Sequence, residues 1–164
     1  SGSDLLALAR AGYHAVGVDI APTAVTVAEA ATAGHENVEV RCGDFLQAAA
    51  PEPRFDLGYD YTFMCALNPR ARPAWAAAWS RHLRVGGELV TLILPVVEKV
   101  GGPPFAVTPE VYSELLLPLG FAAVGGGPRK LDDDECAPGR QGAEWICRWR
   151  LETSPPAPEK SSVL

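Results

Sequence analysis

Short apolar runs alternate with stretches of helical periodicity along most of this chain. Residues 14–20 (HAVGVDI) are apolar and partly β-branched, a pattern typical of a strand covered on both faces of a parallel sheet. The alanine-rich stretch that follows begins at Pro22 and closes at Gly34. Proline favours the first turn of a helix and glycine the position after its last turn. The sequence therefore predicts a strand followed directly by a helix.

The same alternation continues to residue 151. Further strands are expected at 37–44, 55–67, 88–95, 121–124 and 143–151, and further helices at 5–11, 73–84 and 110–117. The helix at 73–84 is expected to stop at Gly86 and Gly87. Strands that alternate with helices at this spacing predict an α/β fold with a doubly wound, mostly parallel sheet.

Length, composition and charge limit the number of domains and the classes of binding partner. With 164 residues, of which 48% are hydrophobic, the chain is long enough for one compact domain. We expect this domain at 1–152, followed by a disordered Pro- and Ser-rich tail at 153–164. A net charge of −6 argues against nucleic acid or an anionic membrane as a partner and favours a small molecule. Four cysteines without metal-site spacing predict reduced, mostly buried thiols and a cytoplasmic location. We also expect a monomer.

Two carboxylates stand at the carboxyl ends of successive predicted strands. Asp19 ends the strand at 14–20, and Asp44 ends the strand at 37–44. Ligands of open α/β sheets bind at this edge, and an acid some 20 residues after a glycine turn holds ribose hydroxyls. The spacing from Gly2 to Asp19 is compatible with that role, which favours a nucleotide-like ligand. The alternative is that both residues only cap helices or turns.

Several short motifs together resemble a known family. In this order and spacing, GSDLLALA, VGVDI, GDF, FDLGYDYTFMCAL, RPAW, LRVGGELVTLILP and GGPPF are similar to the thiopurine methyltransferase superfamily, and most to its thiol and halide methyltransferase branch. The resemblance covers residues 1 to about 150. It implies the class I methyltransferase (Rossmann-like) sheet, with its last strand antiparallel, and S-adenosylmethionine as cofactor.

The resemblance also implies roles for individual residues. Those expected to bind the cofactor are Gly2, Asp19, Ile20, Asp44, Phe45, Asp60 and Tyr61. Of these, Tyr61 lies beside the methyl-donor end in the family and is the catalytic candidate. Leu94 and Phe105 are expected in the substrate pocket, and no metal site is expected.

The implied reaction is an in-line displacement, in which a thiol, bisulfide or halide attacks the sulfonium methyl group. An anion that arrives charged needs alignment and desolvation more than acid–base help. Aromatic candidates for the pocket wall are Tyr61, Phe63, Phe105 and Trp75, although core packing is the expectation for Phe63, Trp75 and Trp79. Arg70 and Arg72 flank a helix start and are expected to be solvated, with contact to an anionic substrate as the alternative.

The chain also departs from the family pattern. Family members carry a strand, two more glycines and a tryptophan-containing segment ahead of the position of Ser1, so we expect this chain to be truncated at its N-terminus. Leu94 stands where plant halide and thiol enzymes tend to have a tyrosine, which weakens a halide-directed interpretation. Two alternatives remain open: a nicotinamide-dependent oxidoreductase, which would use Asp19 equally well, and a non-catalytic methyltransferase remnant.

Overall fold

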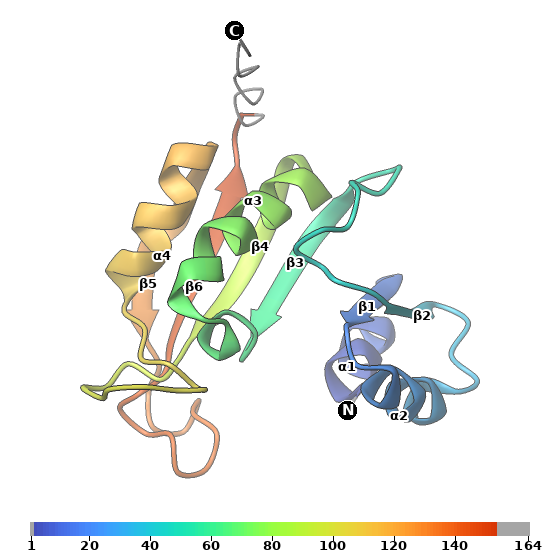
Figure 1. Ribbon diagram of the computed structural model, residues 1–164, viewed down its shortest axis with the longest axis horizontal. Helices are drawn as coiled ribbons and strands as arrows, with labels where there is room; N and C mark the ends of the chain where they lie inside the picture. The colour runs from blue at the N-terminus through green and yellow to red at the C-terminus, as the bar shows by residue number, and fades with distance from the viewer. Residues whose placement is uncertain (1, 154–164) are drawn as a thin grey trace, which may run out of the picture. The chain divides into compact units, whose positions relative to one another are not determined.

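The computed structural model describes residues 2–153, and these divide into two compact units between Ala48 and Ala49. Each unit has its own sheet. That residues 1–152 form one methyltransferase domain stays a prediction. The expected disordered tail lies outside the described residues, apart from Thr153. The two units are described separately below (Figure 1).

The first unit contains two helices and a two-stranded parallel sheet. Its elements are α1 (Ser3–Arg10), β1 (Ala15–Asp19), α2 (Pro22–Thr32) and β2 (Val38–Cys42). The pairing runs from Ala15 opposite Val38 to Asp19 opposite Cys42, so both strands end at the same edge. Pro22 occupies the first turn of α2. The strand–helix order predicted from the pattern is confirmed here.

The second unit contains a four-stranded mixed sheet in the order β3-β4-β6-β5. Its strands are β3 (Phe55–Tyr61), β4 (Leu83–Ile93), β5 (Phe121–Lys130) and β6 (Trp145–Leu151); its helices are α3 (Arg72–His82) and α4 (Pro109–Leu116), with 3-10 turns at Met64–Ala66, Pro69–Ala71 and Leu117–Leu119. The pair β3–β4 is parallel, and β6 is antiparallel to both β4 and β5. The expected antiparallel last strand is therefore present.

One face of this sheet and the two helices enclose the core (Figure 1). Alternate residues of β4 and β6, among them Leu89, Ile93 and Trp149, have no exposed surface. Trp75 of α3 and Tyr112 of α4 meet edge to face, with ring centres 5.6 Å apart. The period of two along the strands thus separates a buried face from one bearing polar residues.

Several local expectations are wrong. The strand expected at 55–67 ends at Tyr61 and is followed by a 3-10 turn at Met64–Ala66. The helix expected to reach Gly86 ends at His82, because Leu83 turns to an extended conformation and pairs with Phe55 of β3. The strand expected at 121–124 extends to Lys130 across a register shift that contains three glycines with positive φ. Arg72 is buried rather than solvated, and its Nη2 donates to the Ala106 carbonyl at 3.2 Å.

The core of the second unit can be tested on β4. Leu89 has no exposed surface, so Leu89→Ala leaves a cavity and should lower the free energy of unfolding by about 2–5 kcal/mol. Val85 on the same strand is 46% exposed, and Val85→Ala should change it by less than about 0.5 kcal/mol. Urea denaturation followed by tryptophan fluorescence measures the free energy of unfolding of the second unit. All four tryptophans, at 75, 79, 145 and 149, belong to this unit. Equal losses in the two variants would contradict the assignment of the core.

Candidate functional site

A small cavity of the first unit joins two residues that the sequence analysis connects with a cofactor. The cavity measures about 140 Å³, and Gly2 and Asp19 both line it. Gly2 has a φ of 82°, and a Cβ there would lie 3.2 Å from Thr32 Cγ2, so the backbone requires glycine. The expected proximity of the glycine turn to the strand-end carboxylate is therefore present.

The strand-end carboxylates also shape their own turns. Asp19 Oδ1 accepts the Ala21 N–H at 2.8 Å, and Asp44 Oδ1 accepts the Leu46 N–H at 2.9 Å. These are the turn roles that the sequence analysis weighs as the alternative to ligand binding. Both side chains are exposed and each turn uses one of the two oxygens, so the turns fix the carboxylates without burying them. Ile20 is 69% exposed beside Asp19.

A larger cavity, about 580 Å³, lies in the second unit. Three segments line it: the one after β3, the one after β4 and the loop before β6. Its lining residues are Thr62, Cys65, Ala66, Leu94, Pro95, Val97, Pro103, Pro104, Gly139, Arg140, Ala143 and Glu144. Most of these are apolar, and the carboxyl ends of β3 and β4 supply two of the three segments. This is the edge at which ligands of such sheets bind.

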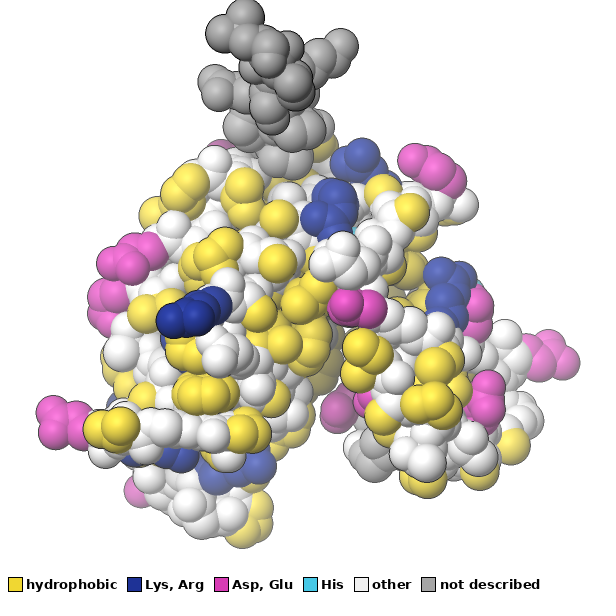
Figure 2. All heavy atoms as spheres, in the orientation of Figure 1, with side chains coloured by type: hydrophobic (Ala, Val, Ile, Leu, Met, Phe, Trp, Pro, Cys, Tyr) yellow, Lys and Arg dark blue, Asp and Glu magenta, His cyan; other side chains and the backbone are white. Residues whose placement is uncertain are grey.

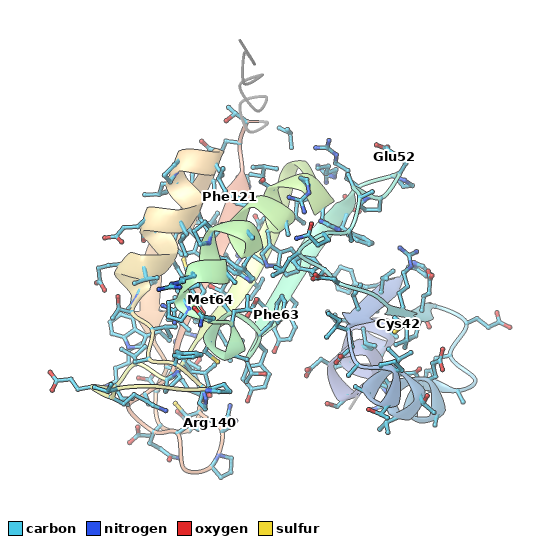
Figure 3. All side chains as sticks on the ribbon, viewed as in Figure 1. Cys42, Glu52, Phe63, Met64, Phe121 and Arg140 are labelled. Atoms are coloured by element: carbon cyan, nitrogen blue, oxygen red, sulfur yellow. The ribbon has the colours of Figure 1, made fainter. Side chains whose placement is uncertain are left out.

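Arg140 is the cation in the wall of this cavity. Its Nη1 donates a short hydrogen bond to the Tyr61 hydroxyl and a second bond, at 3.2 Å, to Glu144 Oε1. Its Cζ lies 5.4 Å from the centre of the Tyr61 ring. Figure 3 labels Arg140 on the loop before β6, below Phe63 and Met64 of the segment that follows β3. The catalytic candidate Tyr61 is thus held by a charged partner 79 residues away in the sequence.

Asp60 lies on the opposite face of β3 from Tyr61 and points into the core. It is 2% exposed, and its Oδ2 accepts the Trp75 indole N–H at 2.6 Å. Its Oδ1 accepts the Met64 N–H at 3.3 Å. Burial, only partly offset by these bonds, raises the pKa of the Asp60 carboxyl to about 6. The structure therefore gives Asp60 a structural role, in which it joins β3, α3 and the segment that begins the cavity wall.

The other predicted site residues divide between cavity and core. Leu94 lines the cavity, and its place in a substrate pocket stays a prediction. Phe105 is not among the lining residues, but its backbone N–H donates to the Cys65 carbonyl at 2.7 Å and so ties two wall segments together. Trp75 is fully buried, which confirms the core interpretation. Phe63 and Phe45 are half-buried.

The sequence analysis missed Arg140 and Glu144. Both lie on a loop without periodicity or a recognised motif, so no local signal marks them. Glu144 is 1% exposed, and a buried glutamate usually has a charged partner.

The cysteines are free thiols, of which Cys65 and Cys147 are buried and Cys42 is exposed. Burial, followed by the nearby Asp60 charge, raises the pKa of the Cys65 thiol. A thiol with a raised pKa forms less thiolate, so Cys65 is not an activated nucleophile. Across residues 2–153, no three His, Cys, Asp or Glu side chains are grouped as a metal site would require.

Hydrophobic side chains are also scattered over the surface in Figure 2. In the first unit the large exposed ones are Tyr13, Val18, Ile20 and Val27. None of the helices in the described part of the chain is both long and apolar enough to span a bilayer.

Comparison with solved structures identifies the fold. A SAM-dependent methyltransferase from Methanosarcina mazei superimposes with a TM-score of 0.71 at 17% identity, covering 89% of this chain and 85% of that one. The strand pairings and this superposition define the class I, S-adenosylmethionine-dependent methyltransferase fold. The family to which the chain belongs follows from the sequence comparisons.

The family model for thiopurine S-methyltransferase (TPMT) matches residues 1–123. Probable thiol methyltransferase 2 of Arabidopsis thaliana is 38% identical, over 94% of this chain and 67% of that protein. Thiocyanate methyltransferase 1 of the same plant is 35% identical, over 91% of this chain and 65% of that protein. The chain belongs to the thiopurine S-methyltransferase family, and it spans about two thirds of the length of these relatives. This membership confirms the resemblance and disfavours the oxidoreductase alternative.

The raised pKa of Asp60 predicts a pH dependence of stability. A carboxyl whose pKa is near 6 when folded and near 4 when unfolded binds its proton more tightly in the folded state. Its stabilising contribution is complete below pH 4 and is lost as the pH rises through 6. The free energy of unfolding of the second unit should therefore fall by about 3 kcal/mol over this window from this group alone.

The comparison is Asp60→Asn, which cannot ionise. Urea titrations followed by tryptophan fluorescence between pH 3.5 and 7.5 should give a smaller fall with pH for this variant. An unchanged pH profile would show that Asp60 does not titrate in this range.

Proposed function

We propose that this protein transfers the methyl group of S-adenosylmethionine to a small soft nucleophile, of which thiols, bisulfide and halides are the candidates. The observation that carries the proposal is the cavity at the carboxyl ends of β3 and β4, in which a mostly apolar wall includes the Arg140 guanidinium. Membership in the methyltransferase family and the names of the relatives support the same chemistry.

The cavity suits an anionic nucleophile that needs no general base. Thr62, Leu94 and the two prolines at 103 and 104 form a surface that removes water from the anion and so strengthens its attack. Arg140 offers a positive charge at the same wall and attracts the anion before displacement. Alignment and desolvation are the contributions that an in-line displacement requires.

The first unit supplies residues that fit the cofactor. Two hydroxyls of a ribose match a strand-end carboxylate, and the exposed Asp19 has one oxygen outside its own turn. Gly2 leaves the backbone open beside it. The sulfonium of the bound cofactor supplies the electrophilic methyl group. The roles of Ile20, Asp44 and Phe45 at the cofactor stay predictions.

We further propose that the protein acts as a cytoplasmic monomer with small-molecule partners. The net charge of −6 supports small-molecule partners, and the four free cysteines support a cytoplasmic location, whereas the monomer stays a prediction. Gel filtration with light scattering measures the monomer directly.

The test of function is methyl transfer from radiolabelled S-adenosylmethionine to bisulfide, benzenethiol and iodide. S-adenosylhomocysteine at 100 times its dissociation constant should stabilise the protein by about 2.7 kcal/mol, which reports cofactor binding separately. Stabilisation without transfer to any of these acceptors would contradict the proposed substrate class. If S-adenosylhomocysteine does not stabilise the protein and no methyl group is transferred, the proposed methyltransferase activity itself is contradicted.

Tyr61→Phe tests the catalytic candidate. The substitution removes the hydroxyl that accepts the Arg140 bond, and loss of a bond to a charged group costs about 1.5–3 kcal/mol. We expect kcat/KM to fall by about 10- to 100-fold. Tyr13→Phe, at an exposed tyrosine of the first unit, is the matched control and should leave kcat/KM unchanged.

A further inference from the structure

Glu144 is buried in the wall of the second-unit cavity, and both of its oxygens are engaged. Its side chain is 2% exposed, whereas that of Arg140 is 39% exposed. Oε2 accepts the Ala137 N–H at 3.1 Å, and Oε1 accepts Arg140 Nη1 at 3.2 Å. A buried carboxylate with fixed partners has little freedom to move, so Glu144 is the rigid end of the ion pair.

The same Arg140 nitrogen is held a second time by the Tyr61 hydroxyl. Two anchors on Nη1 fix the guanidinium plane, and Arg140 packs over the Tyr61 ring as well. Within residues 2–153, the other two nitrogens, Nε and Nη2, donate to no side chain or carbonyl. These two nitrogens form the flat edge of a guanidinium that suits bidentate binding of an anion.

We propose that Glu144 is a positioning residue, which holds Arg140 so that its Nε and Nη2 edge stays available to an anionic nucleophile in the cavity. This inference rests on the proposed function for its kinetic part. Glu144 itself does not touch the nucleophile. Without its bond, Arg140 keeps only the Tyr61 anchor and its edge is no longer fixed, so anions should bind more weakly while the displacement step is little changed.

Glu144→Gln keeps the shape of the side chain and removes its charge. With benzenethiolate as nucleophile, we expect KM to rise at least tenfold while kcat stays within twofold. The matched control is Glu135→Gln, which removes the charge of an exposed glutamate paired with Arg129 away from the cavity lining. Its KM and kcat should equal those of the wild type.

A double-substitution cycle separates positioning from simple structural support. If Glu144 acts through Arg140, Glu144→Gln should change KM by less than twofold when Arg140→Met is already present. A tenfold change in both backgrounds, or no change in either, would overturn the proposal. Melting temperatures of all variants show whether each is folded, and Glu144→Asp replaces Glu144→Gln in the cycle if the latter is not.

A binding measurement keeps the inference independent of activity. Benzenesulfonate is an unreactive anion of similar size to benzenethiolate, and it should shift the NMR signal of the Arg140 Nε–H in the wild type. We expect its dissociation constant to rise at least tenfold in Glu144→Gln and to stay unchanged in Glu135→Gln. Equal affinity in the wild type and Glu144→Gln would overturn the positioning role. If the dissociation constants follow this expectation but no methyl transfer is detected, the proposed function is contradicted and the positioning role of Glu144 is not.

Discussion

A single buried carboxylate connects the layers of the second unit. Asp60 accepts hydrogen bonds from the Trp75 indole on α3 and from the Met64 N–H just after β3. Because a buried polar group without partners is costly, strand, helix and the following segment keep the positions that satisfy it. The next residue, Tyr61, faces the other side of the strand and meets Arg140. The placement of one cavity wall therefore depends on the core contact immediately before it.

The cavity combines features that usually oppose each other. Its apolar wall favours poorly hydrated ligands, and its one ion pair brings a positive charge into the same space. Glu144 pairs with Arg140 through Nη1 and leaves the guanidinium edge of Nε and Nη2 to an anion. Soft anions such as thiolates lose little hydration on entry compared with small hard anions, and they gain a guanidinium partner. Such a balance favours binding of a charged nucleophile and release of a neutral methylated product.

The patterns along the chain predicted most of the fold because its strands and helices are locally encoded. The runs around Val18 and Leu92 are apolar enough to identify strands from sequence alone, and Pro22 marks a helix start. The predicted C-terminal end of α3 was wrong, because Leu83 pairs with Phe55 of β3 and the helix ends at His82. Tertiary pairing of this kind has no signature in the local sequence.

The site was harder to predict than the fold. Tyr61 and Leu94 could be named because motifs around them resemble a family, but Arg140 joins them only through the folded chain. Its contact with Tyr61 spans 79 residues, and the loop that carries it has no periodic pattern. Asp60 was expected at the cofactor, and its burial became visible only once α3 was packed against β3. Long-range contacts of side chains on irregular loops lie beyond single-sequence reasoning.

The strand order has a consequence for synthesis on the ribosome. In the sheet β3-β4-β6-β5, the strand β5 pairs only with β6, which is the last element of the described chain. During translation β5 emerges first and has no partner until residues 145–151 have followed. The nascent chain therefore exposes unpaired strand edges late in synthesis, and a premature stop before β6 would leave both β4 and β5 without their shared neighbour.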